Sequence, residues 1–216
     1  MKVLAFNGSP RKNSTTATLL NKALEGAASQ VAEAEFIQLN QLSMRGCQSC
    51  FSCKKRGGKS YGKCVLKDDM TALYEKIEES DGFFLGSPIY FGSVTSEAKM
   101  FIDRMFPYLN FGNYSSNFPK KIPVGLIYTM GADEQQMKKL GFDQPARFNQ
   151  MMFSMLFGSA ETLLSTDTFH VKDYSEIVAD AMEALVDRKL KHQQEVFPRD
   201  CEKAFEMGAR FAGERK

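Results

Sequence analysis

The sequence lacks the features of a membrane or nucleic-acid protein. No apolar run approaches the roughly 20 residues that cross a bilayer, and the first residues suit a strand and show no signal-peptide pattern. The formal net charge is only +2 at pH 7, so no strong field of either sign covers the chain. We therefore expect a cytoplasmic protein with no membrane and no nucleic-acid partner. The balanced charge also argues against a strongly acidic electron shuttle.

Two common nucleotide motifs are also missing. There is no GxxxxGK[ST], which excludes the usual triphosphate loop, and no GxGxxG, which excludes the usual dinucleotide fingerprint. Residues 6–16 nevertheless read FNGSPRKNSTT, between a β-rich apolar run and apolar residues at helical spacing. Free N-H groups and hydroxyls at a helix start favour an anion, so this loop predicts a site for one terminal phosphate. Helix capping by Asn13, Ser14 and Thr16 without any ligand is the alternative.

The remaining pattern is an alternation of short apolar runs and amphipathic stretches. Such alternation predicts an α/β fold with a doubly wound, five-stranded parallel sheet of order 2-1-3-4-5 and helices on both faces. With 216 residues, we expect a single domain over 1–216 with a cysteine-rich insert at about 44–68. The expected strands are 2–6, 33–39, 82–87, 122–130 and 162–169, and the expected helices are 17–28, 70–77, 94–105, 146–157 and 201–211.

Three loops would meet at the carboxyl edge of this sheet. In the expected order, strands one and three flank the switch point, so residues 6–16 and 87–93 form opposite walls of one cleft, with 129–131 beside them. The second wall, GSPIYFG over 86–92, combines a tight turn with the flat faces of Tyr90 and Phe91. It suits a planar heteroaromatic ring. The alternative is an ordinary loop whose aromatic residues close the core.

Four of the five cysteines, Cys47, Cys50, Cys53 and Cys64, crowd into one short segment. This suits a reducing compartment and metal or redox chemistry better than a secreted disulfide framework. Four thiolates can hold a [4Fe-4S] cluster or a tetrahedral zinc ion, or they can remain free thiols. Five basic residues between Cys53 and Cys64 would lower thiol pKa values, or form a solvated turn.

At this point the motifs carry a resemblance. GSPR at 8–11 with NSTT at 13–16, followed by GSPIYFG at 86–92 and FIDR at 101–104, resembles the NAD(P)H-dependent FMN reductases of flavodoxin-like fold. More narrowly, the CxxCxxC run from Cys47, followed by CVLKDDM from Cys64, resembles the iron-sulfur flavoprotein branch. The similarity spans residues 2 to about 129.

The resemblance implies FMN as cofactor, with a phosphate site and a ring site. It places the phosphate at Ser9, Arg11, Ser14, Thr15 and Thr16, and the isoalloxazine against Pro88, Ile89, Tyr90, Phe91 and Gly92. The residues themselves add Lys12, Asn13, Thr129 and Met130 to the expected cofactor site, and Tyr128 as a further wall residue.

The same resemblance implies an FMN-dependent oxidoreductase that uses NAD(P)H to reduce flavin, quinone or a small electrophilic acceptor. The alternative is an iron-sulfur flavoprotein that carries electrons between protein partners, and a third possibility is a zinc-braced binding module. We expect no catalytic side chain, because the flavin supplies the chemistry and the two histidines, His170 and His192, lie in late segments.

Apolar residues in two further segments predict contacts. Helix 146–157 is apolar on more than one face, which predicts a homodimer interface, with deep burial as the alternative. The resemblance likewise implies a homodimer or homotetramer with the flavin near an interface. The aromatic segment 106–118 is expected to be a lid, a partner surface or core.

Overall fold

The computed structural model describes residues 1–213, so the last three residues of the expected domain lie outside the description. Its sheet runs in the order β2-β1-β3-β5-β6 with every neighbouring pair parallel, which confirms the predicted order. One short extra strand pairs antiparallel with β3. The strands are β1 (Lys2–Asn7), β2 (Glu33–Gln38), β3 (Gly82–Tyr90), β4 (Ser93–Val94), β5 (Ile122–Thr129) and β6 (Gly158–Ser165).

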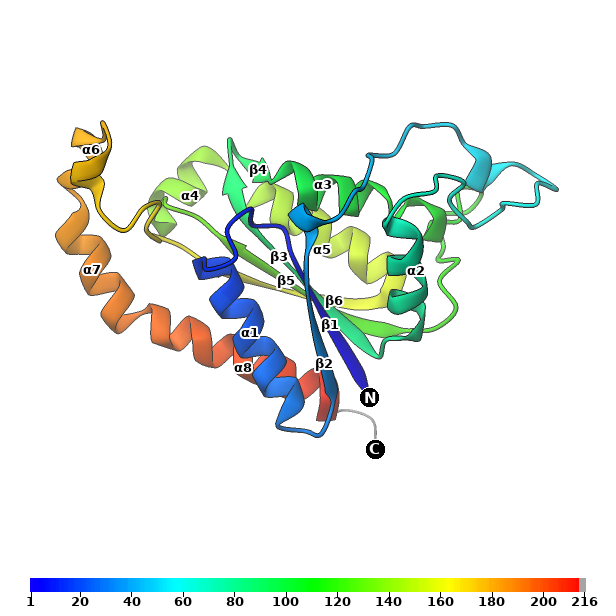
Figure 1. Cartoon of the computed structure of the whole chain (residues 1–216), viewed down its shortest axis with the longest axis horizontal. Helices are drawn as coiled ribbons and strands as arrows, with labels where there is room; N and C mark the ends of the chain where they lie inside the picture. Colours follow the sequence, from blue (N-terminus) through cyan, green and yellow to red (C-terminus); the bar gives the residue numbers. More distant parts are fainter. Residues whose placement is uncertain (214–216) are drawn as a thin grey trace.

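Helices cover both faces of the sheet, as expected for a flavodoxin-like fold (Figure 1). Alternate residues of β1 point to opposite faces, so Val3 and Ala5 enter one core and Leu4 and Phe6 the other. The first core includes α1 (Thr15–Ala28) and α8 (Phe197–Gly213), and the second includes α2 (Met70–Glu79), α3 (Ser96–Asp103) and α5 (Gln144–Phe157).

Helices α1 and α8 pack unusually closely. A Cβ atom added at Gly208 would lie 1.8 Å from the carbonyl oxygen of Ala23, and one at Gly26 would lie 1.9 Å from that of Phe205. Only glycine permits this approach of the two backbones. The contact fixes the axis of α1, whose first turn follows the predicted phosphate loop.

Two predicted strand boundaries are wrong because hydrogen-bonded pairing with neighbouring strands sets where these strands begin and end. β3 continues to Tyr90 because Ser87 and Pro88 still pair with β5 and Ile89 pairs with β4. β6 occupies 158–165 rather than 162–169, since its register with β5 begins at Gly158, directly after α5. Gly158 has a positive φ of 107°, so helix and strand join there without a loop.

Periodicity does not predict three of the helices that follow residue 133. α8 begins before Pro198, because proline is tolerated in the first turn of a helix. No expectation covers α4 (Glu134–Leu140), α6 (Asp180–Glu183) or α7 (Val186–Glu195). In Figure 1, α6 and α7 extend from α8 as an arm. Among residues 1–213, no helix combines the length and apolar character needed to cross a bilayer.

Candidate functional site

A cleft of about 1100 Å³ opens at the carboxyl ends of β1, β3 and β5. Every expected cofactor-binding residue except Phe91 and Gly92 lines it. The predicted phosphate loop, residues 9–16, forms one wall, and Pro88, Ile89 and Tyr90 at the end of β3 form the opposite one. Residues 129–131 adjoin these walls, and the rest of the lining comes from residues 168–175, from α1 and from parts of α6, α7 and α8. Residues 168–175 and the parts of α6, α7 and α8 were not predicted.

A network of side-chain amides holds the predicted phosphate loop in shape. Asn7 accepts a hydrogen bond from the backbone N-H of Ser9 at 3.0 Å and donates to Gln38 at 2.7 Å. Gln38 donates to the carbonyl of Ser9 at 2.6 Å, and Asn40 donates to that of Pro10 at 2.9 Å. The network uses the loop carbonyls as acceptors and leaves the later N-H groups free. Polar residues at two strand ends were the only sequence signal for it.

The free N-H groups lie at the start of α1. Within residues 1–213, no hydrogen-bond acceptor serves the backbone N-H groups of residues 12–16. The hydroxyl of Ser14 accepts from the N-H of Ala17 at 3.2 Å, so the expected capping role and an open row of donors occur together. Such a row at a helix N-terminus favours an anion.

Two predicted phosphate ligands make other contacts. The hydroxyl of Thr16 is buried and lies 2.8 Å from that of Thr129, so this pair joins α1 to β5. The Arg11 guanidinium donates to the carbonyl of His170 and thereby bridges the phosphate loop to residues 168–175. Arg11 is therefore at the cleft but also ties its two sides together.

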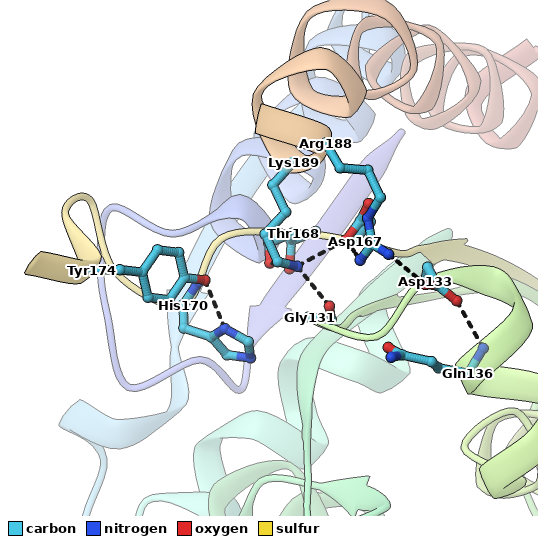
Figure 2. A network of polar contacts seen from close by, with 9 residues as sticks. All are labelled: Gly131, Asp133, Gln136, Asp167, Thr168, His170, Tyr174, Arg188 and Lys189. Atoms are coloured by element: carbon cyan, nitrogen blue, oxygen red, sulfur yellow. Dashed lines mark hydrogen bonds and ion pairs between the residues drawn. The ribbon is translucent and has the colours of Figure 1, made fainter. Parts of the chain in front are cut away.

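Next to residues 168–175 lies an ionic network whose centre, Lys189 and Asp167, is buried (Figure 2). The ammonium of Lys189, which is fully buried, donates to the carbonyls of Gly131 at 2.7 Å and Thr168 at 3.2 Å and pairs with Asp167 at 2.9 Å. Arg188 bridges Asp167 at 2.8 Å and Asp133 at 2.9 Å. One turn of α7 thus fixes two segments of the cleft wall.

The charges in this network shift two pKa values. Burial opposes ionisation of Asp167, but the bonds from Lys189 and Arg188 outweigh it and hold its pKa below the usual value. Burial, with the nearby charges of Lys189 and Arg11, lowers the pKa of His170. The His170 ring also lies 2.9 Å from the Tyr174 hydroxyl and packs against Gly131 (Figure 2).

Three expected wall residues lie outside the cleft lining. Phe91 and Gly92 form the two-residue turn between β3 and β4, both with positive φ as a type I′ hairpin requires, and the Phe91 side chain is fully exposed. Tyr128 is fully buried and accepts a bond from Asn149 at 3.1 Å. Burial raises the pKa of Tyr128 to about 12 despite that bond, consistent with a core position.

The four clustered cysteines line a second, much smaller hollow, which we call the thiol hollow. Cys53 is buried, Cys64 half-buried, and Cys47 and Cys50 are exposed. Across the described chain, no three His, Cys, Asp or Glu side chains converge closely enough to hold one metal ion. The thiols therefore share a hollow without forming a ready mononuclear site.

The aromatic segment 106–118 packs partly into the core and partly beside the insert. Tyr108 and Phe118 are buried, while Phe51 of the insert makes edge contacts with Phe106 and Phe111, each with 5.8 Å between ring centroids. Of the three expectations, core packing holds for the buried part. None of this segment lines the cleft.

A family model and several curated sequences match this chain. The model of the family described as NADPH-dependent FMN reductase matches residues 1–140. An iron-sulfur flavoprotein of Methanocaldococcus jannaschii is 40% identical over 107 residues, which make up 50% of this chain and 53% of that protein. One from Archaeoglobus fulgidus is 37% identical over 108 residues, 50% of this chain and 47% of that protein. The chain spans about half the length of these curated relatives.

Solved structures agree on the fold. An NAD(P)H:quinone oxidoreductase from Methanothermobacter marburgensis superposes with a TM-score of 0.68 at 14% identity, covering 100% of this chain and 99% of that one. An FMN-dependent NADH-azoreductase from Bacillus anthracis gives 0.65 at 12% identity, with 99% and 100% coverage. At such low identity the likeness concerns the fold alone. The family match over residues 1–140 carries the assignment: the chain belongs to the NADPH-dependent FMN reductase family.

Proposed function

We propose that residues 1–216 form one FMN-binding domain with a cysteine-rich insert, and that it works as an NAD(P)H-dependent oxidoreductase. One observation carries the proposal: free N-H groups at the start of α1 face a cleft whose other wall is the apolar end of β3. Its volume of about 1100 Å³ is sufficient for a mononucleotide and a second small reactant.

Each wall has a distinct task in this proposal. Residues 12–16 would bind the phosphate through backbone N-H groups, with Arg11 and Lys12 adding charge. Pro88, Ile89 and Tyr90 would present a flat surface to the ring, with Thr129 and Met130 on the adjoining side. Bound FMN would supply hydride and single-electron chemistry. The protein would orient the ring and exclude water, without any acid-base residue of its own.

The test is spectroscopic and kinetic. The purified protein, loaded with FMN, should oxidise NADPH or NADH in the steady state when a quinone or ferricyanide is supplied. Comparing the two nucleotides and several acceptors would then define the substrate class. Stoichiometric FMN binding with no steady-state turnover of either nucleotide would refute the enzyme proposal and favour a carrier of electrons.

The first prediction concerns Arg11. Arg11→Ala should weaken FMN binding by about 1 to 3 kcal/mol, the scale of a charge-assisted hydrogen bond. Fluorescence titration of FMN measures this. Lys22→Ala is the matched control, because Lys22 is an exposed cation on α1 that pairs with Glu25 outside the cleft. An affinity for FMN that is the same in both variants would remove Arg11 from the site.

A second function, electron transfer through an iron-sulfur centre to a protein partner, is favoured by the thiol hollow. All four cysteines line it, yet no three converge on one point. In a [4Fe-4S] centre each thiolate binds a different iron, so wider spacing suits a cluster better than tetrahedral zinc. The hollow encloses only about 20 Å³, so the exposed Cys47 and Cys50 would close around metal on binding.

The second prediction is therefore an iron count. Anaerobic reconstitution should load about four irons per chain, and Cys50→Ala and Cys64→Ala should each lose most of them. Cys201→Ala, on α8, is the control and should keep the wild-type count. Fewer than about two irons in the wild type would reject the cluster and leave a plain flavin reductase.

The third prediction concerns assembly. We propose a homodimer that uses the outer face of α5, where Phe148 and Met151 are 59% and 57% exposed although Phe153 and Phe157 are buried. Sedimentation of the wild type at micromolar concentration should give a dimer or tetramer, and Phe148→Asp with Met151→Asp should give a monomer. A monomeric wild type would contradict the proposal.

A further inference from the structure

Hydrogen bonds join the two ends of the cysteine-rich insert, where it leaves and re-enters the body of the domain. The chain leaves the body near Ser43 and returns at Asp69, whose carboxylate accepts from the N-H of Ser43 at 2.7 Å. One residue earlier, the carboxylate of Asp68 accepts from the N-H of Arg45 at 3.1 Å. The two limbs of the insert therefore start side by side.

Arg104, which lies outside the insert at the end of α3, is bonded to both limbs. Its guanidinium donates to the carbonyl of Arg45 at 2.7 Å and forks onto the two carboxylate oxygens of Asp68 at 2.7 and 3.1 Å. Its side chain is only 1% exposed, and the hydroxyl of Tyr74 donates to its carbonyl at 2.6 Å. Such a bidentate contact fixes direction as well as distance.

The Arg104–Asp68 pair, which we call the clamp, lies beside the thiols. Arg104 lines the thiol hollow together with the four cysteines. Along the chain, Cys47 follows Arg45 by two residues and Cys64 precedes Asp68 by four. Ten residues separate Cys53 from Cys64, and bringing the ends of such a loop together carries an entropy cost. Bonds that hold both limbs at their base reduce the conformational freedom left to the thiols.

We propose that Arg104, with Asp68, is the positioning residue of the thiol site: it holds Cys47 and Cys64 together before any metal binds. The proposal rests on the proposed four-cysteine site, but the positioning itself concerns the metal-free chain. The rival is that this buried pair only stabilises the fold. The positioning role predicts that removing the pair separates the thiols while the rest of the protein stays folded. A purely structural role predicts no such selective change.

The test measures thiol proximity directly. In a background of Cys50→Ser, Cys53→Ser and Cys201→Ser, only Cys47 and Cys64 remain, and a short bifunctional maleimide reports how often they meet. The clamp is removed by Arg104→Met with Asp68→Leu, since deleting both partners leaves no uncompensated buried charge. The control removes in the same manner the exposed pair of Arg210 and Glu161, in which one guanidinium nitrogen donates to both carboxylate oxygens.

Cross-linking should slow about tenfold without the clamp, a factor that corresponds to only about 1.4 kcal/mol. The control pair should leave the rate unchanged, and FMN binding should be the same in all variants, which shows that the body remains folded. Arg104→Lys alone should give an intermediate rate, because an ammonium cannot fork onto the carboxylate. Equal cross-linking rates with and without the clamp would overturn the inference.

Iron loading separates this inference from the proposed cluster. With all cysteines present, loss of the clamp should lower the iron bound per chain after anaerobic reconstitution to less than half of the wild-type value. If the wild type binds no iron but cross-linking still depends on the clamp, the cluster fails and the positioning role stands. If iron loads fully in the clamp-free variant, the positioning role is refuted and the cluster stands.

Discussion

Lys189→Met should lower the free energy of unfolding by about 3 kcal/mol, because it breaks a buried ion pair and leaves two carbonyls without their donor. Lys189 is fully buried, and its ammonium donates hydrogen bonds to Asp167, Gly131 and Thr168. Methionine preserves most of the side-chain volume, so the loss would report the polar contacts and not a cavity. Arg188 remains to pair with Asp167, which keeps the effect below that of an isolated buried charge.

The same variant should weaken FMN binding. Gly131 and Thr168 both line the cleft, and Lys189 is the group that holds their carbonyls in place (Figure 2). Chemical denaturation and FMN titration measure the two effects. Lys191→Met is the matched control, because Lys191 lies two residues along α7 and is exposed. Equal stability of the two variants would show that the network does not support the cleft.

The pH dependence of this effect has a definite sign. The folded pKa of Asp167 is held below its unfolded value, so its ion pairs stabilise the protein fully above the unfolded pKa of about 3.9. That contribution is lost as the pH falls from there through the folded pKa. The stability difference between wild type and Lys189→Met should therefore be largest near neutral pH and shrink in acid. A difference that stays constant down to about pH 3 would contradict this origin.

Gly208→Ala should destabilise the protein by about 3 kcal/mol, at the upper end of the usual range for overpacking. The new Cβ would lie 1.8 Å from the carbonyl oxygen of Ala23 and 3.0 Å from the N-H of Ala27. Both are backbone atoms of α1, so no side chain can rotate away and the helices must separate. Alanine otherwise favours a helix by up to about 1 kcal/mol over glycine, so a net loss would come from the clash.

Displacing α1 also moves the predicted phosphate site. The N-H groups of residues 12–16 precede or begin this helix, so Gly208→Ala should weaken FMN binding as well as lower the melting temperature. Gly213→Ala on the same helix is the control, because within residues 1–213 its added Cβ would meet only the Gln30 side chain at 3.9 Å. Wild-type stability in Gly208→Ala would mean that the close approach of the helices is not required.

The two main walls of the cleft could be predicted because each is formed by one continuous segment of the sequence. A β-rich run, a hydroxyl-rich loop and a helical period stand next to one another over residues 2–28, and the second wall is a continuous GSPIY segment. Parallel strands place such loops at one edge whatever the side chains between them do. The strand order followed from the alternation of elements and is confirmed.

The later elements could not be placed in the same way. β6 follows α5 without a loop, so its boundary depends on pairing with β5 rather than on any turn residue. Of the apolar side chains in residues 166–196 only Tyr174 is buried, and α7 is held by Lys189 and Arg188 instead of by an apolar face. Hydrophobic periodicity gives no signal for a segment anchored by charge.

The sequence by itself determined the sheet order, through the alternation of its elements, and the positions of the hydroxyl-rich loop and of the four clustered thiols, because these two segments consist of residues that are neighbours in the chain. Only the tertiary structure decided three long-range contacts. Lys189 supports the cleft wall by pairing with Asp167, 22 residues earlier, and Arg104 joins the two ends of the insert by pairing with Asp68, 36 residues earlier. Two glycines bring α1 and α8 into backbone contact. These contacts join residues far apart in sequence. A long-range polar or close-packed contact leaves no periodic trace in the chain, since its partners are chosen by the packing of the whole fold.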